Sequence, residues 1–457
     1  MQTTKIFLMA ALALMTAACS NDDNDILPPA EQPAKSEGIP FTATISMGES
    51  ASTRALAEDN VNNKIVATWK TGEKVALIYD AGGTPTKTDA EVTKQADGTA
   101  TITATLESGA TNGSAVTIIY PSDAADGTTG NVKSDWLSSQ VGTLTGTGGT
   151  SIAEKYDVRK GTGKLSINDG KATVNNGTAG TPVSLTNQNA IFKLTLKDID
   201  GTSDVSANSV IISDQTGTVT TVTPASGYEN AMYVALPTTA TTLKFLVTGS
   251  DSKKYFNMAS SLTLSASYYQ STIKLATVGH VIASNGKCYK DDAATPGGNT
   301  AVAKICYVGG DNGEAAPYNH GLALALSDAN GGTACKWKTS RTAAGHTKQT
   351  SSTFTEESGL QYNANHNSGD YPAFQAAIAN NGTAAPTGCS SWFLASGYQW
   401  KKMIGAGLSN LGLQSNDYYW SSSENSVNFA WNFYSNDGRW DPYSKDGGGL
   451  VRSCLAF

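Results

Sequence analysis

Short runs of alternating apolar and polar residues fill the chain from about residue 41 to residue 275. The clearest run is 190–197, where Phe192, Leu194 and Leu196 are separated by Lys or Thr. This period of two is typical of a strand with one face packed and the other in water. Residues 75–79 alternate in the same way, and 243–247 predict a more buried strand. Gly, Asp, Asn, Ser and Thr separate the runs, as in antiparallel β-sandwiches.

A Gly- and Pro-containing break at residues 177–182 divides this half of the chain. We therefore expect one β-sandwich over 39–182 and a second over 183–276. Only 16% of the residues are charged and the net charge is −7, which suits a secreted β-rich protein better than a helical cytosolic enzyme. There is no run of Lys or Arg, so nucleic acid is not an expected partner.

The pattern changes after residue 278, where helical signals appear. An Ala-rich stretch from Pro372 to about residue 380 predicts a short helix. Ser396 and Gln399 have the spacing of a capping box, and the apolar residues that follow lie at one-face helical spacing. Alternation returns at 429–433, a turn is predicted at 435–438, and 450–457 reads as a final apolar strand.

Tryptophan and cysteine are concentrated in this last part of the chain. Six of the eight Trp residues lie beyond residue 280, as do all cysteines except Cys19, namely Cys288, Cys306, Cys335, Cys389 and Cys454. We expect a separate α+β domain over 278–457. In an oxidising compartment up to two disulfides could form, and the spacing leaves every pairing open.

The first nineteen residues resemble a bacterial lipoprotein signal peptide. Lys5 precedes an apolar run at 6–15, and Thr-Ala-Ala leads to Cys19. The run is too short to span a bilayer, so 1–18 are expected to be removed and Cys19 to be acylated. The alternative is an ordinary secretory signal with an incidental cysteine. Residues 20–25 (Ser-Asn-Asp-Asp-Asn-Asp) open an acidic, Pro-containing linker, 19–38, and resemble the surface-export signal of Bacteroidetes lipoproteins, which implies a place on the outer membrane surface. The alternative is that they are simply part of a solvated linker.

Five segments, taken together, resemble Bacteroidetes fimbrillins. They are 41–45 (Phe-Thr-Ala-Thr-Ile), 53–55 (Thr-Arg-Ala), 68–75 (Thr-Trp-Lys-Thr-Gly-Glu-Lys-Val), 233–237 (Tyr-Val-Ala-Leu-Pro) and 268–273 (Tyr-Tyr-Gln-Ser-Thr-Ile). The resemblance implies two transthyretin-like β-sandwiches and assembly into pili by donor-strand exchange with other fimbrial subunits. It also implies that an arginine-specific protease cuts between Arg54 and Ala55. The alternative is that Arg54 is simply an exposed residue of a polar loop.

Residues 278–457 resemble the major-paralogue surface domains, which are related to the C-type-lectin-like fold. The segments that carry the likeness are 321–326, 392–396, 419–424 and 451–454. The resemblance implies a disulfide between Cys389 and Cys454. The Glu-Pro-Asn or Gln-Pro-Asp triplet of calcium-dependent lectins is missing from the sequence, so we expect no metal and no cofactor.

The loop 425–449 is where we expect any ligand to bind. Its aromatic residues offer flat contact area, and its Asn, Asp and Arg residues offer oriented hydrogen bonds. The candidate contacts are Trp431, Tyr434, Asn436, Asp437, Arg439, Trp440, Asp441 and Tyr443. The alternative is that Trp431 packs inside and the remainder forms a solvated hairpin.

No sequence motif for a nucleophile, zinc site or phosphate loop occurs, and the four histidines lack metal-ligand spacing. We therefore expect a non-enzyme: a pilus subunit, placed at the tip, whose last domain adheres to a host or microbial glycan or protein. The alternative is a monomeric surface lipoprotein, held by its lipid in the outer membrane, that binds or modifies polysaccharide. A polymerising subunit should lose residues 19–54, whereas a nutrient-binding lipoprotein should keep them.

Overall fold

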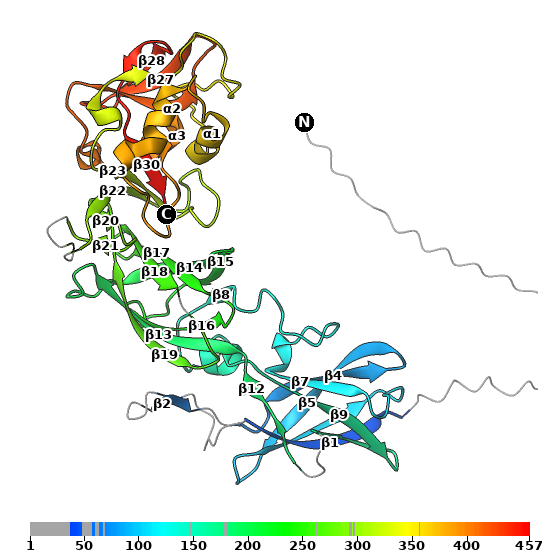
Figure 1. Cartoon of the computed structure of the whole chain (residues 1–457). Helices are drawn as coiled ribbons and strands as arrows, with labels where there is room; N and C mark the ends of the chain where they lie inside the picture. The colour runs from blue at the N-terminus through cyan, green and yellow to red at the C-terminus, as the bar shows by residue number, and fades with distance from the viewer. Residues whose placement is uncertain are drawn as a thin grey trace, which may run out of the picture.

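The structure, a computed structural model, describes residues 37–47, 57–59, 64–66, 69–146, 148–176, 181–261, 263–291, 295, 298–355 and 357–457. Strands take 43% of the chain and helices 11%, so the predicted mainly β class is confirmed. Figure 1 shows three units that follow one another in chain order, from blue through green to red. Within the described residues, no helix is both long and apolar enough to cross a membrane.

The first unit is a nine-stranded sheet that closes on itself. Its strands are β1 (Ile39–Ser46), β4 (Lys74–Ala81), β5 (Thr84–Lys94), β6 (Ala100–Leu106), β7 (Ala115–Tyr120), β9 (Arg159–Asn168), β10 (Lys171–Asn175), β11 (Val183–Ser184) and β12 (Thr186–Asn187). Their order is β10-β1-β6-β5-β4-β7-β9-β12, with β11 beside β1, and pairing of β9 with β10 closes the ring. A small hairpin of β2 (Ala57–Asp59) and β3 (Lys64–Val66) forms its own sheet.

Strand β4 is buried on both faces, which differs from the simple alternation in its sequence. Val75 and Leu77 face the core inside the sheet, as the pattern predicts. Ala76 and Ile78 are also buried, because the connection between β7 and β9 folds back over the outer face. That connection contains the short helices η1 (Ser122–Ala124) and η2 (Ile152–Tyr156). A cover that comes from a distant part of the chain leaves no local signal in the strand itself.

The second unit packs a three-stranded sheet on a five-stranded sheet. The first has the order β16 (Ala231–Pro237), β13 (Asn189–Asp198) and β19 (Tyr268–Leu275). The second has the order β18 (Lys254–Ser261), β17 (Thr242–Gly249), β14 (Ala207–Asp214), β15 (Gly217–Val222) and β8 (Ser139–Gln140). The predicted strands at 190–197 and 243–247 are confirmed as β13 and β17, and their apolar residues form the core between the sheets.

Strand β8 ties the first two units together. It belongs to the connection that follows β7, yet it pairs with β15 of the second unit. The side chain of Gln140 is buried there and exchanges hydrogen bonds with the backbone of Ala235, at 2.8 and 2.9 Å. Strands β11 and β12 lie beyond residue 182 but pair with β1 and β9, so the first sheet extends a few residues past the predicted division.

The C-terminal unit is built on a six-stranded sheet with helices beside it. The sheet order is β21 (Cys288–Tyr289), β20 (Val281–Ala283), β22 (Ala301–Val308), β23 (Gly321–Ala325), β30 (Ser453–Ala456) and β25 (Phe393–Leu394). A three-stranded sheet follows with β26 (Tyr418–Glu424), β27 (Phe429–Tyr434) and β28 (Trp440–Ser444), and β24 (Cys335–Lys336) pairs with β29 (Gly448–Gly449). The helices are α1 (Gly359–Asn365), α2 (Pro372–Ala379) and α3 (Gly397–Gly405), with 3₁₀ turns η3 (Asn330–Gly332), η4 (Asn380–Gly382) and η5 (Leu408–Leu411).

Both predicted helices are confirmed. Helix α2 starts at Pro372, and α3 starts with a complete capping box in which Ser396 and Gln399 each bond the other's backbone N–H. Helix α1 was not predicted, since its sequence Gly-Leu-Gln-Tyr-Asn-Ala-Asn has no helical apolar period. The final strand is shorter than expected and covers only Ser453–Ala456.

An apolar interface joins the second unit to the C-terminal unit. The ring of Phe256 on β18 packs at a tilt against the ring of Phe457, with centroids 4.5 Å apart. Lys244 of β17 is buried at this joint, and its ammonium donates to the carbonyl oxygens of Pro317 and Gly388. Figure 1 shows the C-terminus at this joint and β27 and β28 at the far end of the C-terminal unit.

Candidate functional site

Strand β1 is the first strand of the chain but lies in the interior of its sheet. It pairs antiparallel with β6 over seven residues, from Ile39 to Ile45. On its other side it pairs in parallel with β10 at Phe41 and with β11 at Ile45 and Ser46. Removing β1 would therefore expose backbone donors and acceptors on the strands at both sides of the gap.

The side chains of β1 alternate strictly between core and solvent. Phe41, Ala43 and Ile45 are 2%, 5% and 0% exposed, while Pro40, Thr42 and Thr44 are exposed. The buried residues belong to the core of the first unit, together with Leu77 of β4. Without β1, the unit would show an apolar groove with a row of side-chain pockets, which is the surface that an added strand recognises.

An ion pair holds the end of β1 in place. The guanidinium of Arg159 donates to the carbonyl oxygen of Met47 at 3.0 Å. Its Nε lies 3.2 Å from Oδ1 of Asp157, which is itself buried. The predicted processing residues Arg54 and Ala55 follow a few positions later, and they lie outside the described residues, as does the predicted lipidation residue Cys19.

The second candidate surface, here called the distal face, is the partly exposed end of the β26–β27–β28 sheet around Tyr418, Tyr434 and Arg439. Tyr418 and Tyr434 stand directly opposite each other on β26 and β27. The guanidinium of Arg439 lies 4.2 Å from the ring centre of Tyr434 and donates to the hydroxyl of Tyr418 at 2.6 Å. Asp437 and Asp441 accept from the same guanidinium at 3.2 and 3.4 Å. These contacts pre-organise two aromatic rings beside a neutralised cation.

Amide groups border this aromatic cluster. The side chain of Asn436 donates to Oδ1 of Asn416 at 2.7 Å, and the hydroxyl of Tyr434 donates to the same oxygen at 2.9 Å. Five of the predicted contacts therefore gather in one place, namely Tyr434, Asn436, Asp437, Arg439 and Asp441. Tyr418 and Asn416 were not predicted, because only the strand pairing brings them next to β27.

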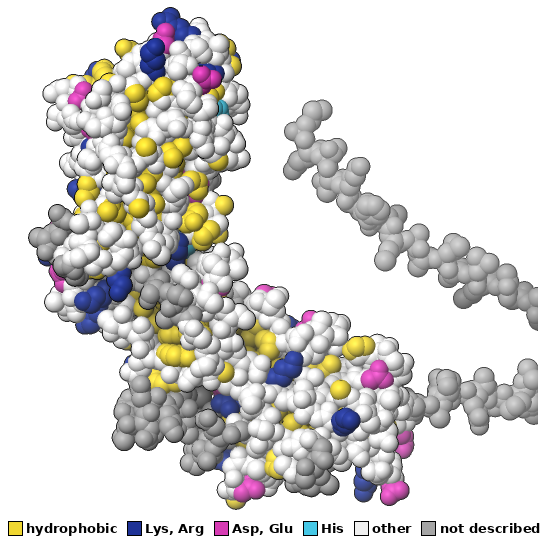
Figure 2. All heavy atoms as spheres, viewed as in Figure 1, with side chains coloured by type: hydrophobic (Ala, Val, Ile, Leu, Met, Phe, Trp, Pro, Cys, Tyr) yellow, Lys and Arg dark blue, Asp and Glu magenta, His cyan; other side chains and the backbone are white. Residues whose placement is uncertain are grey.

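The other three predicted contacts lie elsewhere. Trp431 is 6% exposed and its indole N–H donates to the carbonyl of Gln349. It therefore packs inside, which is the alternative given above for this residue. Trp440 is half-buried against Phe354 and Phe433, on the opposite side of the sheet from Tyr434. Tyr443 is exposed on the same hairpin. Figure 2 shows charged side chains gathered at the far end of this unit.

The structure does not bring the predicted disulfide partners Cys389 and Cys454 together. The structure holds five free thiols in the described residues. Cys454 packs with Leu324 and Phe393 on one face of the six-stranded sheet. Cys389 packs on the other face, against the cluster that contains Leu455 and Phe457. Side chains on opposite faces of a sheet cannot be bridged, because successive strand residues point in opposite directions.

Buried polar groups fill the centre of the C-terminal unit, and their hydrogen bonds are internal. Glu424 forms a fully buried ion pair with Lys445. Glu357 accepts from Tyr362 at 2.8 Å and from Ser423 at 2.8 Å, and burial raises its pKa. Such a network specifies the packing of the domain. Among the described residues, no group of three or more His, Cys, Asp or Glu side chains could hold a metal ion.

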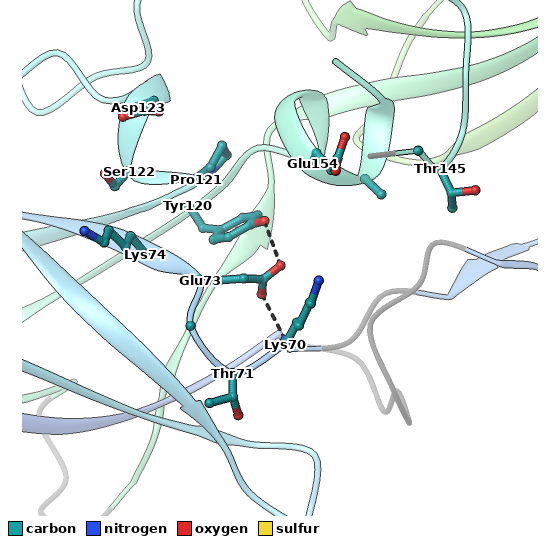
Figure 3. A pocket seen from close by; sticks show the side chains of 13 residues that line it. Lys70, Thr71, Glu73, Lys74, Tyr120, Pro121, Ser122, Asp123, Thr145 and Glu154 are labelled. Atoms are coloured by element: carbon teal, nitrogen blue, oxygen red, sulfur yellow. Dashed lines mark hydrogen bonds between the residues drawn. The ribbon is translucent and has the colours of Figure 1, made fainter. Parts of the chain in front are cut away.

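The first unit contains a polar cleft of about 620 Å³, which Figure 3 shows. Its walls come from the turn that holds Lys70 and Glu73, the end of β7 and helix η2. Glu73 accepts from the hydroxyl of Tyr120 at 3.3 Å and from the backbone N–H of Lys70 at 2.9 Å. Among the described side chains that line this cleft there is neither a His nor a Cys.

No protein-family model matches the chain, and no curated protein matches it with significant similarity. Among solved structures, a fimbrial protein from Bacteroides ovatus aligns with 92% of this chain and 99% of its own length, at 13% identity and a TM-score of 0.31. Putative cell adhesion proteins from Bacteroides fragilis and Bacteroides uniformis each align with 53% of this chain and 94% of their own, at 13% and 14% identity and TM-scores of 0.28 and 0.26. TM-scores of this size do not establish a shared fold.

Proposed function

We propose that this chain is a subunit of a surface pilus that exchanges its first strand for a strand of a neighbouring subunit. The observation that carries the proposal is the position of β1. The strand is interior to its sheet, its apolar residues fill the core, and a cleavable Arg54-Ala55 bond follows eight residues after Ser46. Proteolysis there would separate β1 from the rest of its unit, and the emptied groove would be refilled by β-augmentation.

The position of β30 supports a place at the tip. This last strand lies between β23 and β25, and every residue from Ser453 to Phe457 is buried. The carbonyl oxygen of Phe457 accepts from the backbone N–H of His320 at 2.8 Å. A strand with partners on both sides is not available for donation to another subunit. Strand β30 is therefore not expected to be donated to another subunit, which is compatible with the proposed place at the tip.

Strand exchange is tested with the full-length chain, an arginine-specific protease and a fluorescent peptide of residues 39–47. The cleaved chain should bind one peptide per molecule, and the uncleaved chain should bind none. Two controls are matched to this design. Arg54→Lys keeps the charge but resists the protease, and a peptide with Asp in place of Phe41 and Ile45 keeps the length but lacks the anchors. Equal binding of both peptides, or no binding after cleavage at Arg54, would contradict the proposal.

For the distal face we propose adhesion to a glycan. The rings of Tyr418 and Tyr434 offer flat area for a sugar ring, and Asn436, Asp437 and Asp441 offer hydrogen-bond partners for hydroxyl groups. The alternative function, a monomeric lipoprotein that binds nutrient polysaccharide, would use the same face. It differs in requiring that residues 19–54 remain attached.

The glycan proposal predicts that Arg439→Ala weakens binding of the full chain to a glycan array. Loss of this guanidinium leaves Asp437 and Asp441 without their partner and frees the Tyr434 ring, so binding should fall at least about tenfold, or roughly 1.4 kcal/mol. Arg341→Ala is the matched control, because Arg341 is also an exposed residue paired with an aspartate, Asp446. Equal binding by both variants would place the contact elsewhere.

A further inference from the structure

Two of the five thiols lie on the same side of the joint between the second unit and the C-terminal unit. Cys288 on β21 is opposite Ile282 on β20, so both side chains point to one face of the sheet. Ile282 belongs to the apolar cluster that contains Phe256 and Phe457, and both Cys288 and Cys389 pack against that cluster. The side chains of Cys288 and Cys389 therefore contact the same apolar cluster.

The backbones that carry these thiols touch each other. Gly286 forms the turn between β20 and β21, and a Cβ added there would collide with the carbonyl oxygen of Thr387. Cys288 follows Gly286 by two residues, and Cys389 follows Thr387 by two residues. Met258 gives a second point of proximity. It lines one cleft together with Cys288, and its Sδ would lie 2.7 Å from a Cβ placed on Gly388.

The remaining thiols are in positions that exclude them as partners. Cys306 and Cys454 share a face, but they lie on β22 and β30, with β23 between them. Strands that are two apart are separated by about 9.5 Å, whereas a disulfide joins Cα atoms at roughly 4.4–6.8 Å. Cys335 on β24 packs in a third cluster, against residues that include Trp337. Among the five described cysteines, Cys288 and Cys389 are the pair whose neighbouring backbone segments lie in contact.

A buried charge lies next to one of the two thiols. The ammonium of Lys244 donates to the carbonyl of Gly388 at 3.3 Å and sits beside the Cys389 thiol. Burial raises the pKa of Cys389 to about 12, and the Lys244 charge opposes that rise. Burial, followed by the neighbouring Cys389 thiol, raises the pKa of Cys288 to about 12. Both thiols are thus protonated and unreactive in the finished fold, so a bond between them would form while the chain folds.

We propose that Cys288 and Cys389 form a disulfide that fastens the first hairpin of the C-terminal unit to the 386–389 loop at the joint. The inference rests on the surface location that is part of the proposed function, because cytosolic thiols are kept reduced. The oxidant is a protein or small-molecule disulfide. The Cys389 thiolate attacks it, forming a mixed disulfide and releasing one thiolate. The Cys288 thiolate then attacks Sγ of Cys389 and releases the second, so two electrons and two protons leave the pair.

The bond would link two parts of the C-terminal unit where that unit borders the second unit. On one side it holds β20 and β21, which begin that unit, and on the other it holds the loop that precedes β25. Lys244 and Phe256 reach into the same joint from the second unit. A covalent link here would resist pulling forces on an adhesive end. Cys335, Cys306 and Cys454 would stay reduced.

The test is peptide mapping of the full chain isolated from the native cell surface, unfolded in an alkylating agent without reductant. Trypsin cuts after Lys287 and Lys290, which leaves Cys288 in a three-residue peptide, and after Lys348 and Lys401, which enclose Cys389. Cys454 falls in the separate peptide 453–457. We expect 288–290 linked to 349–401, and alkylation of the other three of the five thiols. Alkylated Cys288 and Cys389 both here and in the refolding experiment below, or a link from 349–401 to any other peptide, would overturn the inference.

A second experiment separates this inference from the proposed location. The purified, reduced full chain is unfolded and then refolded with a mixture of reduced and oxidised glutathione, and the same peptides are mapped. If the disulfide forms in this refolding experiment but is absent from the protein isolated from cells, the proposed location is wrong while the pairing of Cys288 with Cys389 stands. Cys389→Ser should abolish the link and make the melting temperature insensitive to reductant. Cys335→Ser, the matched control, should keep both the link and the fall in melting temperature on reduction, and failure in either respect would contradict the pairing.

Discussion

At the residue scale, the environment of a side chain decides roles that its type alone leaves open. Trp431 and Tyr434 occupy the same strand and both looked like ligand contacts, yet Trp431 is buried with its N–H bonded and Tyr434 stays at the surface. The sequence of β27 alternates, but residues 430–433 are all buried, so both faces of the strand are covered until its end at Tyr434. Part of that cover is Phe354, a residue far from β27 in the chain, whose ring packs against Trp431.

His346 shows how burial makes stability depend on pH. Its ring stacks on Tyr362 at 3.9 Å and its Nδ1 bonds the carbonyl of Ser422. Burial, followed by the nearby His366, lowers the pKa of His346 to about 3, from an ordinary value of 6.5. The folded state thus holds the neutral ring. The stabilisation is complete above pH 6.5 and is lost as the pH falls from 6.5 towards 3, where the unfolded chain binds the proton first.

The lowered pKa of His346 predicts that the free energy of unfolding of the chain falls between pH 7 and pH 5. Wild type should lose stability, and His346→Gln should flatten the slope by on the order of 1 kcal/mol per pH unit. Some slope should remain, because burial also lowers the pKa of His320, to about 4. Urea unfolding at several pH values measures this. A variant with the same slope as wild type would show that His346 takes up its proton equally well in both states.

At the element scale, the predictions that were confirmed are those whose physical cause lies within a few neighbouring residues. The capping box of α3 and the alternation of β13 are written within a few residues, and both were confirmed. The double burial of β4 and the pairing of β8 with the second unit depend on a connection that returns from elsewhere. The distal face was predicted in part, because Tyr418 joins it only through strand register. The assignment of transthyretin-like and lectin-like domains stays a prediction.

The alternating burial along β1 predicts that substitutions at neighbouring positions differ sharply in their effect on stability. Phe41→Ala removes a side chain that is 2% exposed from the core of the first unit and should cost about 3–5 kcal/mol of its stability. Thr42→Ala changes an exposed side chain on the same strand and should stay within about 0.5 kcal/mol. Denaturant unfolding of the uncleaved chain measures both. Similar values for the two variants would mean that β1 does not hold the core together and that its groove has no anchoring pockets.

At the scale of the whole molecule, the two ends of the chain have opposite characters. The first described strand is followed by the Arg54-Ala55 bond that we propose is cut, while β30 lies between two partner strands and Phe457 is buried at a joint. This asymmetry underlies the proposal of a subunit that accepts a strand and presents its final unit outward. The distal face then lies at the far end from the first unit (Figure 1).

The most direct test of this account is the N-terminus and intact mass of the protein isolated from the native cell surface. Strand exchange predicts a chain that begins at Ala55, without residues 19–54 and without a lipid. A chain that begins at an acylated Cys19 and still carries β1 would contradict maturation by strand exchange, and it would favour the lipoprotein that binds polysaccharide.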